Sequence, residues 1–343
     1  MSTPTAPPEE PVAPAEERPP STLQRIASGS STQIGLILVA LIVAFSLLSF
    51  SEFFTVANGR NIATDAAVLL VLAVGATYVI VTAGIDLSVG SVLVFSGVVS
   101  AKLMNEVGGN GWGVILIGLA AALASGLGWG LLNGVLVAKA KLPAFIVTLG
   151  TFNIAFALTH VYSHDLTFTG LPSELLFFGR TFTLFGADVT YGVVFMLVLY
   201  VVAWYALTQT AGGRHVYAVG DNPQAARLTG ISVNRVLLTV YTLAGLTGGV
   251  AAMLLVARTE LGDPNAGQTT ENLDSITAVV LGGTSLFGGR GSIIATLIGA
   301  VIVGVIRNGL TLIGVQVIYQ YLVTGVLVIL AVSVDQLVRR RRV

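Results

Sequence analysis

The sequence predicts an all-α integral membrane protein with about ten transmembrane helices, some of them short or broken. The chain is 54% hydrophobic and 10% charged, and its mean hydropathy is +0.87. In a soluble domain, about a quarter of the residues carry charge. The 40 glycines point the same way, because small residues let helices pack closely in lipid.

The apolar segments follow an N-terminal tail. Residues 1–33 are rich in Pro, Glu and Ala, which predicts a disordered cytoplasmic tail and not a cleaved signal peptide. Residues 34–337 form the membrane domain, and residues 338–343 form a basic cytoplasmic tail. The expected helices lie near 34–50, 63–82, 91–104, 113–138, 143–163, 190–208, 235–258, 272–287, 289–307 and 315–335. The third and eighth are short for a span, which needs roughly 20 residues.

The distribution of basic residues supports ten crossings with both termini in the cytoplasm. This topology places twelve of the 17 Lys and Arg residues inside and five outside, as expected if basic loops stay cytoplasmic. A re-entrant eighth segment would instead place the terminal arginines outside. We therefore expect ten full crossings.

Several classes of function are excluded by what the sequence lacks. It has no net charge to attract nucleic acid, no cysteine, and no GxxxxGK[ST] motif to bind the phosphates of ATP. No serine-hydrolase or zinc-protease motif is present. His160 and His164 have the spacing of a metal-binding pair, but a third ligand is missing and interfacial histidines are the preferred interpretation. We expect no catalytic, cofactor or metal site in this chain.

The segment AGIDLSVGSV (83–92) is the first candidate for a transport site. An aspartate in mid-membrane costs roughly 2.5–3.5 kcal/mol, so Asp86 should lie near the inner surface or in a watery cavity. Asp86 and Ser88 can cap the helix that resumes at Ser91, and broken helices with capped ends often build transport sites. Both a structural cap and a direct substrate contact remain open.

Further polar residues lie within or beside the apolar segments. Asn133 and Asn153 can each bond a sugar hydroxyl or a neighbouring helix, whereas the glycines at 126, 130 and 134 indicate helix packing. The glycine-rich segment 271–292 allows bends, and within it Asp274 and Thr284 are candidates for the substrate pathway. A helix cap is the alternative for Asp274. A weak internal echo pairs VGAT and GSV (74–77, 90–92) with LGGT and GSI (281–284, 291–293).

A polar, basic stretch between two apolar segments predicts a short cytoplasmic helix. Asn222 can cap it with Asp221 beside it, Pro223 suits its first position, Ala225 and Ala226 favour helix, and Gly230 can end it. We expect this helix to contact a soluble protein that moves it. Its docking face would consist of Ala225, Ala226 and Leu228. Arg214 and Arg227 either assist docking or only follow the positive-inside rule.

Four blocks resemble the permease subunits of bacterial ABC importers for ribose, xylose and arabinose. They are AGIDLSVGSV, NGVLVAKAKLPAFIVTLGT (133–151), GRHVYAVGDNPQAARLTGI (213–231) and LDSITAVVLGGTSLFGGRGS (273–292), and the resemblance extends over about 34–337. It implies a multi-pass protein of the bacterial inner membrane. It also implies a second permease subunit (we expect a homodimer), a cytoplasmic ATPase that binds ATP and magnesium, and an extracytoplasmic sugar-binding protein. Asp221–Gly230 would be the coupling helix on the ATPase.

Two alternatives differ from this interpretation. The same architecture can carry a nucleoside, an autoinducer or a branched-chain amino acid. A stand-alone secondary transporter would explain the scattered polar residues, but the sequence shows no paired Asp–Arg or Glu–Lys relay deep within a segment.

Overall fold

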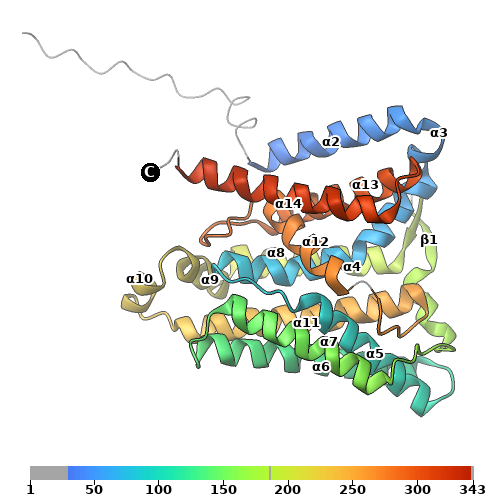
Figure 1. Cartoon of the computed structure of the whole chain (residues 1–343), viewed down its shortest axis with the longest axis horizontal. Helices are drawn as coiled ribbons and strands as arrows, with labels where there is room; N and C mark the ends of the chain where they lie inside the picture. Colours follow the sequence, from blue (N-terminus) through green and yellow to red (C-terminus); the bar gives the residue numbers. More distant parts are fainter. Residues whose placement is uncertain (1–29, 185–186, 267, 341–343) are drawn as a thin grey trace, which may run out of the picture.

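The computed structural model describes residues 30–184, 187–266 and 268–340, which fold into a bundle of long helices (Figure 1). The helices are α2 (Ser30–Leu48), α3 (Phe50–Phe53), α4 (Val56–Val81), α5 (Val89–Val107), α6 (Trp112–Ala138), α7 (Ala144–Ser163), α8 (Tyr191–Gln209), α9 (Ala211–Asp221), α10 (Pro223–Leu228), α11 (Val233–Thr259), α12 (Gln268–Leu281), α13 (Ile293–Leu312) and α14 (Val317–Arg340). Helix α2 begins at Ser30, four residues before the expected boundary of the tail. Residues 1–29 of that tail lie outside the described part.

Each of the ten expected segments overlaps one helix, but fewer of these helices are long and apolar enough to span a membrane. Six described helices are long and apolar enough to cross a membrane: α4, α6, α7, α8, α11 and α13. Helix α12 has 14 residues and is about 21 Å long, against a hydrocarbon core of roughly 30 Å. It ends at Leu281 and not near 287, because the glycines that follow form a loop. Ten crossings therefore remain a prediction.

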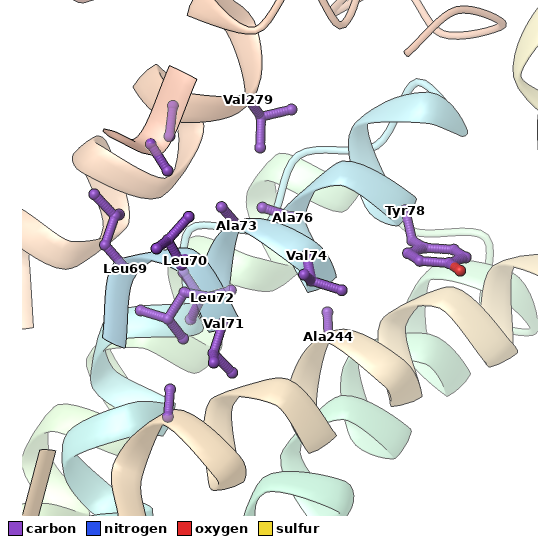
Figure 2. Packing of buried hydrophobic residues seen from close by; sticks show 14 of the residues in the cluster. Leu69, Leu70, Val71, Leu72, Ala73, Val74, Ala76, Tyr78, Ala244 and Val279 are labelled. Carbon is purple, nitrogen blue, oxygen red and sulfur yellow. The ribbon is translucent and has the colours of Figure 1, made fainter. Parts of the chain in front are cut away.

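Helix α4 forms the centre of the bundle. Its apolar segment is 89% buried, whereas those of α7 and α8 are 28% buried. Figure 2 shows Leu69 to Val74 of α4 packed between Ala244 of α11 and Val279 of α12. From Ala66 to Val81, α4 is almost entirely apolar, as expected for a helix buried in a protein core or in a membrane.

The small residues of α6 and α11 bring the backbones of these two helices into close contact. A Cβ atom at Gly126 would lie 2.3 Å from the carbonyl oxygen of Gly245, and one at Gly130 would lie 2.5 Å from that of Tyr241. Gly134 meets the backbone of Leu238 in the same way. The packing interpretation of this glycine row is therefore confirmed.

One short segment departs from the all-α expectation. Between α7 and α8, a 3₁₀ helix (η1, Ser173–Gly179) precedes an antiparallel hairpin of β1 (Thr181–Leu184) and β2 (Ala187–Thr190). The residues of TFTL favour a strand. This segment is short and lies between two long apolar segments whose patterns predict helices. Figure 1 places β1 at one end of the bundle and α9 and α10 at the other.

Candidate functional site

The break between α4 and α5 brings together three of the predicted pathway residues. Oδ1 of Asp86 accepts hydrogen bonds from the backbone N–H of Ser88 at 2.8 Å and from its hydroxyl at 2.6 Å. Asn133 of α6 donates to the hydroxyl oxygen of Ser88 at 2.8 Å. All three residues are buried. The carboxylate therefore stabilises the turn of the broken backbone that precedes α5.

Ser88 acts differently from the expected cap. Helix α5 resumes at Val89 and not at Ser91, and the Ser88 side chain makes no capping bond to it. The hydroxyl is occupied between Asp86 and Asn133. A backbone N–H at the start of α5 is instead hydrogen-bonded by a residue of another helix: the N–H of Gly90 donates to Oδ1 of Asn272 in α12.

Tyr241 of α11 belongs to the same cluster, although the sequence did not single it out. A Cβ at Gly84 would lie 2.6 Å from the Tyr241 hydroxyl oxygen, so only glycine fits beside the phenol. Neither that oxygen nor Oδ1 of Asn133 has a hydrogen-bond partner in the described part of the chain. A buried polar atom without a partner costs free energy, so this cluster has spare capacity for a water molecule or a polar ligand.

Asp274 lies in a second cluster, formed by α12 and α13. Its carboxylate accepts a hydrogen bond from the guanidinium of Arg307, and a guanidinium nitrogen of Arg307 lies 3.9 Å from Oε1 of Glu271. No Asp–Arg pair deep within a segment was visible in the sequence, but the structure pairs Asp274 with Arg307 across two helices. Thirty-three residues separate the two partners in the sequence, so only the antiparallel packing of α12 on α13 brings them together. The capping alternative for Asp274 is also wrong, because the residue lies within α12.

The outer part of this charged region continues to α4 and α11. Arg258 pairs with Asp65 at 2.8 Å, and both side chains are exposed. Beside this pair lies a cavity of about 570 Å³, at the end of the bundle that carries β1. Its lining is mainly polar: Arg60, Asn61, Thr64, Asp65, Gly179, Arg180, Thr181 and Thr190.

Two predicted pathway residues do not join either cluster. Asn153 is exposed on α7, and its amide donates within its own helix to the carbonyl of Leu149 at 3.0 Å. Thr284 is buried in the loop after α12, beside Gly291, and its hydroxyl has no partner in the described residues. Of the six predicted pathway residues, Asp86, Ser88 and Asn133 therefore form one cluster, and the other three lie in separate places.

The short helix predicted within 221–230 forms as expected, as α10. Oδ1 of Asn222 accepts from the N–H groups of Gln224 and Ala225, and Pro223 occupies the first helical position of α10. At its other end, Ile231 N–H donates to Ala226 and Gly230 N–H donates to Arg227, with Gly230 at φ +86°. This is the pattern of a Schellman motif, which needs a residue in the left-handed conformation.

The exposed face of α10 differs from the expected one. Leu228 is 90% exposed, and Asp221, Pro223, Ala225 and Arg227 are also exposed. Ala226 is only 4% exposed and packs against Val219 and Val233. The expectation that Ala226 belongs to a docking face is therefore wrong. It holds α10 against α9 and α11.

The residues that the sequence analysis missed carried weak signals. Asn272 and Glu271 belong to the segment ENLDS, in which Asp274 drew attention alone. Tyr241 is the one aromatic residue of α11, where it lies among mostly small and aliphatic side chains. In the structure, Gly84 packs against its hydroxyl group.

Long apolar helices with buried polar clusters between them fit a membrane transport protein. Residues 58–332 match the family described as "Branched-chain amino acid transport system / permease component", and the chain belongs to this family. It is 42% identical to the fructose import permease protein FrcC of Rhizobium meliloti over 93% of this chain and 89% of that one.

Other relatives carry similar names. The chain is 43% identical to the ribose import permease protein RbsC of Escherichia coli K12, covering 87% of this chain and 92% of that one. It is 33% identical to the L-arabinose ABC transporter permease protein AraH of Azospirillum brasilense, covering 90% and 88%. No solved structure matches the chain. The matched family is one of transport-system permease components, and the listed relatives are named as import or transport permeases.

Proposed function

We propose that this chain is the permease subunit of an ABC importer that carries a monosaccharide, such as a pentose or fructose, across the bacterial inner membrane. Both termini are cytoplasmic in this proposal, and ten segments cross. A separate ATPase binds ATP and magnesium, and an extracytoplasmic binding protein delivers the sugar. The names of relatives that cover nearly the whole chain support a sugar over an amino acid, although the family description names the latter.

The exposed helix α10 is the observation that best supports this proposed function. Leu228 projects from a helix that is capped at both ends and held from behind by Ala226. An exposed leucine on a helix this well fixed is suited to bury itself in a protein partner, and the chain has no phosphate-binding loop of its own. Asp221 and Arg227 are exposed at and on α10, Arg214 is exposed on α9, and these charges can set the orientation of that partner.

This proposal is tested with the permease, its ATPase and its binding protein in vesicles. Leu228→Glu should abolish ATP-driven sugar uptake and weaken ATPase binding about tenfold or more, because a buried contact becomes a desolvated charge. Gln224→Glu is the matched control, since it adds the same charge on the same exposed helix. Equal ATPase binding in both variants would contradict the docking role of α10.

A second copy of the chain is the expected partner within the membrane. Asn153 is exposed on α7 among apolar side chains such as Ile154 and Phe156, and an amide that faces hydrocarbon is unfavourable. A second permease subunit packed on α7 would cover the amide, and the sugar pathway would then run beside this contact. Thr284 and the cluster around Asp86 would line its inner part.

The chain lacks native cysteine, so this contact can be tested by cross-linking. Asn153→Cys should form disulfide-linked dimers in membranes treated with a mild oxidant. Val201→Cys on α8 is the control, because that position is 63% exposed on another helix. Cross-linking at 201 but not at 153 would place the contact elsewhere.

The pair of Asp274 and Arg307 gives the secondary-transporter alternative one specific observation in its favour. Such paired charges occur in proton and ion pathways. Uptake into vesicles that contain this chain alone, driven by an ion gradient without ATP, would favour that alternative. The sugar itself is identified by the ligand that raises the melting temperature of the binding protein.

A further inference from the structure

The end of α4, the end of α9 and the loop after α12 meet through their backbones. Gly289 N–H donates to the carbonyl of Val81 at 2.9 Å. A Cβ at Gly220, near the end of α9, would lie 1.8 Å from that carbonyl oxygen and 2.7 Å from the nitrogen of Gly289. The end of α9 therefore lies directly on this hydrogen bond, without an intervening side chain.

The neighbouring glycines make this contact closer still. A Cβ at Gly288 would lie 2.6 Å from the carbonyl oxygen of Gly220, and Gly288 has φ +82°. Gly289, at φ +72°, packs on Asp221 at the very end of α9. We call Gly220, Gly288, Gly289 and Val81 the glycine joint. The positive φ values of Gly288 and Gly289 disfavour any other residue type there. A Cβ atom at any of the three glycines would also require a shift of the backbone.

A side-chain bond reinforces the glycine joint. The hydroxyl of Tyr217 in α9 donates to the carbonyl of Gly291 at 2.8 Å. Burial raises the pKa of Tyr217 above its ordinary value, so the phenol remains a donor at neutral pH. Helix α9 thus contacts the loop in two ways, through the backbone of Gly220 and through the hydroxyl of Tyr217.

Helix α10 is attached to the same body. Asn222 N–H donates to Ala218 of α9 at 3.1 Å, and Ala226 packs against Val219. On the other side, Val81 leads directly into the break that contains Asp86, and Gly289 lies in the loop that contains Thr284. The glycine joint is therefore placed between the exposed helix and both interruptions of the bundle.

We propose that the glycine joint is the rigid connection through which a displacement of α10 reaches both helix breaks. The inference rests on the proposed function, in which an ATPase displaces α10. In this mechanism α10, α9, the end of α4 and the loop 282–292 move as one body. A side chain at position 220 would separate α9 from α4, and the ATPase would then act without moving the breaks.

The first test measures distances between spin labels on a chain that has no native cysteine. One pair joins Gln224→Cys on α10 to Arg290→Cys on the loop, and the other joins Gln224→Cys to Lys139→Cys at the end of α6. Labelled chains are diluted with unlabelled ones, so that only distances within one chain contribute. Between the nucleotide-free and the ATP-trapped complex, the 224–290 distance should stay constant while the 224–139 distance shifts. A 224–290 change as large as the 224–139 change, or no change in either, would overturn the proposal.

The second test compares ATP use with uptake. Gly220→Ala should hydrolyse ATP on addition of the binding protein, but its uptake per ATP should fall about tenfold, within the range by which substitutions along a coupling route act. Gly212→Ala is the matched control in the same helix, because its Cβ would meet only Thr210 at an ordinary 3.6 Å. The control should keep uptake per ATP within about twofold of the unmodified chain.

The two proposals fail in distinguishable ways. If the unmodified complex shows no ATP-driven uptake, the proposed function is wrong. If it transports normally and Gly220→Ala retains the same uptake per ATP, the glycine joint alone is wrong. Should Gly220→Ala fail to assemble, the spin-label distances still decide, because they use the chain with its native glycine.

Discussion

Two buried aspartates in this protein are stabilised in opposite ways. Asp86 accepts two hydrogen bonds from Ser88, two residues away, and has no arginine or lysine among its bonded partners. Asp274 is 1% exposed and relies on Arg307, which belongs to another helix. The first arrangement depends on a local turn and the second on tertiary packing. The comparison shows that a buried carboxylate needs a partner, but that sequence proximity does not reveal which kind.

The largest effect is expected from removing the partner of Asp274. Arg307→Met should lower the free energy of unfolding by about 3–5 kcal/mol, because it leaves a buried charge unpaired. The melting temperature in mild detergent measures this loss. The double variant Arg307→Met with Asp274→Leu should recover much of it, since neither charge remains. If the single variant melts like the unmodified chain, the pair is not what stabilises Asp274.

A smaller effect is expected at Asp86, and it separates the two roles that the sequence left open. Asp86→Ala should cost about 1–3 kcal/mol, because the N–H of Ser88 loses its acceptor. Asp86→Asn should melt within about 1 kcal/mol of the unmodified chain, since the amide oxygen accepts the same bonds. If Asp86→Asn folds but does not transport, the charge itself contacts the substrate or controls the opening. Normal transport by Asp86→Asn would leave Asp86 a structural cap.

Ser88 should show a cost of about 1–2 kcal/mol, as expected when one buried hydrogen-bond partner is lost. Ser88→Ala removes the hydroxyl between Asp86 and Asn133, so the amide of Asn133 loses its acceptor. A double-mutant cycle with Asn133→Leu measures the coupling of the two side chains. Additive effects in that cycle would show that the bond does not contribute.

The smallest effect is expected at the exposed pair of Arg258 and Asp65. Arg258→Ala should change stability by only about 0–1 kcal/mol, because water and salt screen both side chains. Melting curves at low and high salt check this, and any loss should shrink as salt rises. A loss as large as that of Arg307→Met would mean that Arg258 instead compensates the nearby Glu271.

Helix α10 could be predicted closely because its signals are local. Asn222, Pro223 and Gly230 each act on backbone groups within a few residues, and all three occupy the positions that capping rules assign. The orientation of α10 could not be predicted in the same way. Ala225 and Ala226 have identical propensities, and only the packing of α9 and α11 decides that Ala226 faces inward.

Composition and periodicity by themselves determined that this is a helical membrane protein, where its apolar segments lie, and where its backbone breaks near Asp86. Those properties follow from the free-energy cost of placing unpaired backbone N–H and C=O groups in lipid. Each segment must avoid that cost through its own helical hydrogen bonds. Tertiary structure decided that Arg307 pairs with Asp274, that Asn153 faces outward, and that Gly220 meets Val81. The contacts of Arg307 and Gly220 join residues that lie 33 and 139 positions apart in the sequence. The residue pattern of one helix does not show which other helix packs against it.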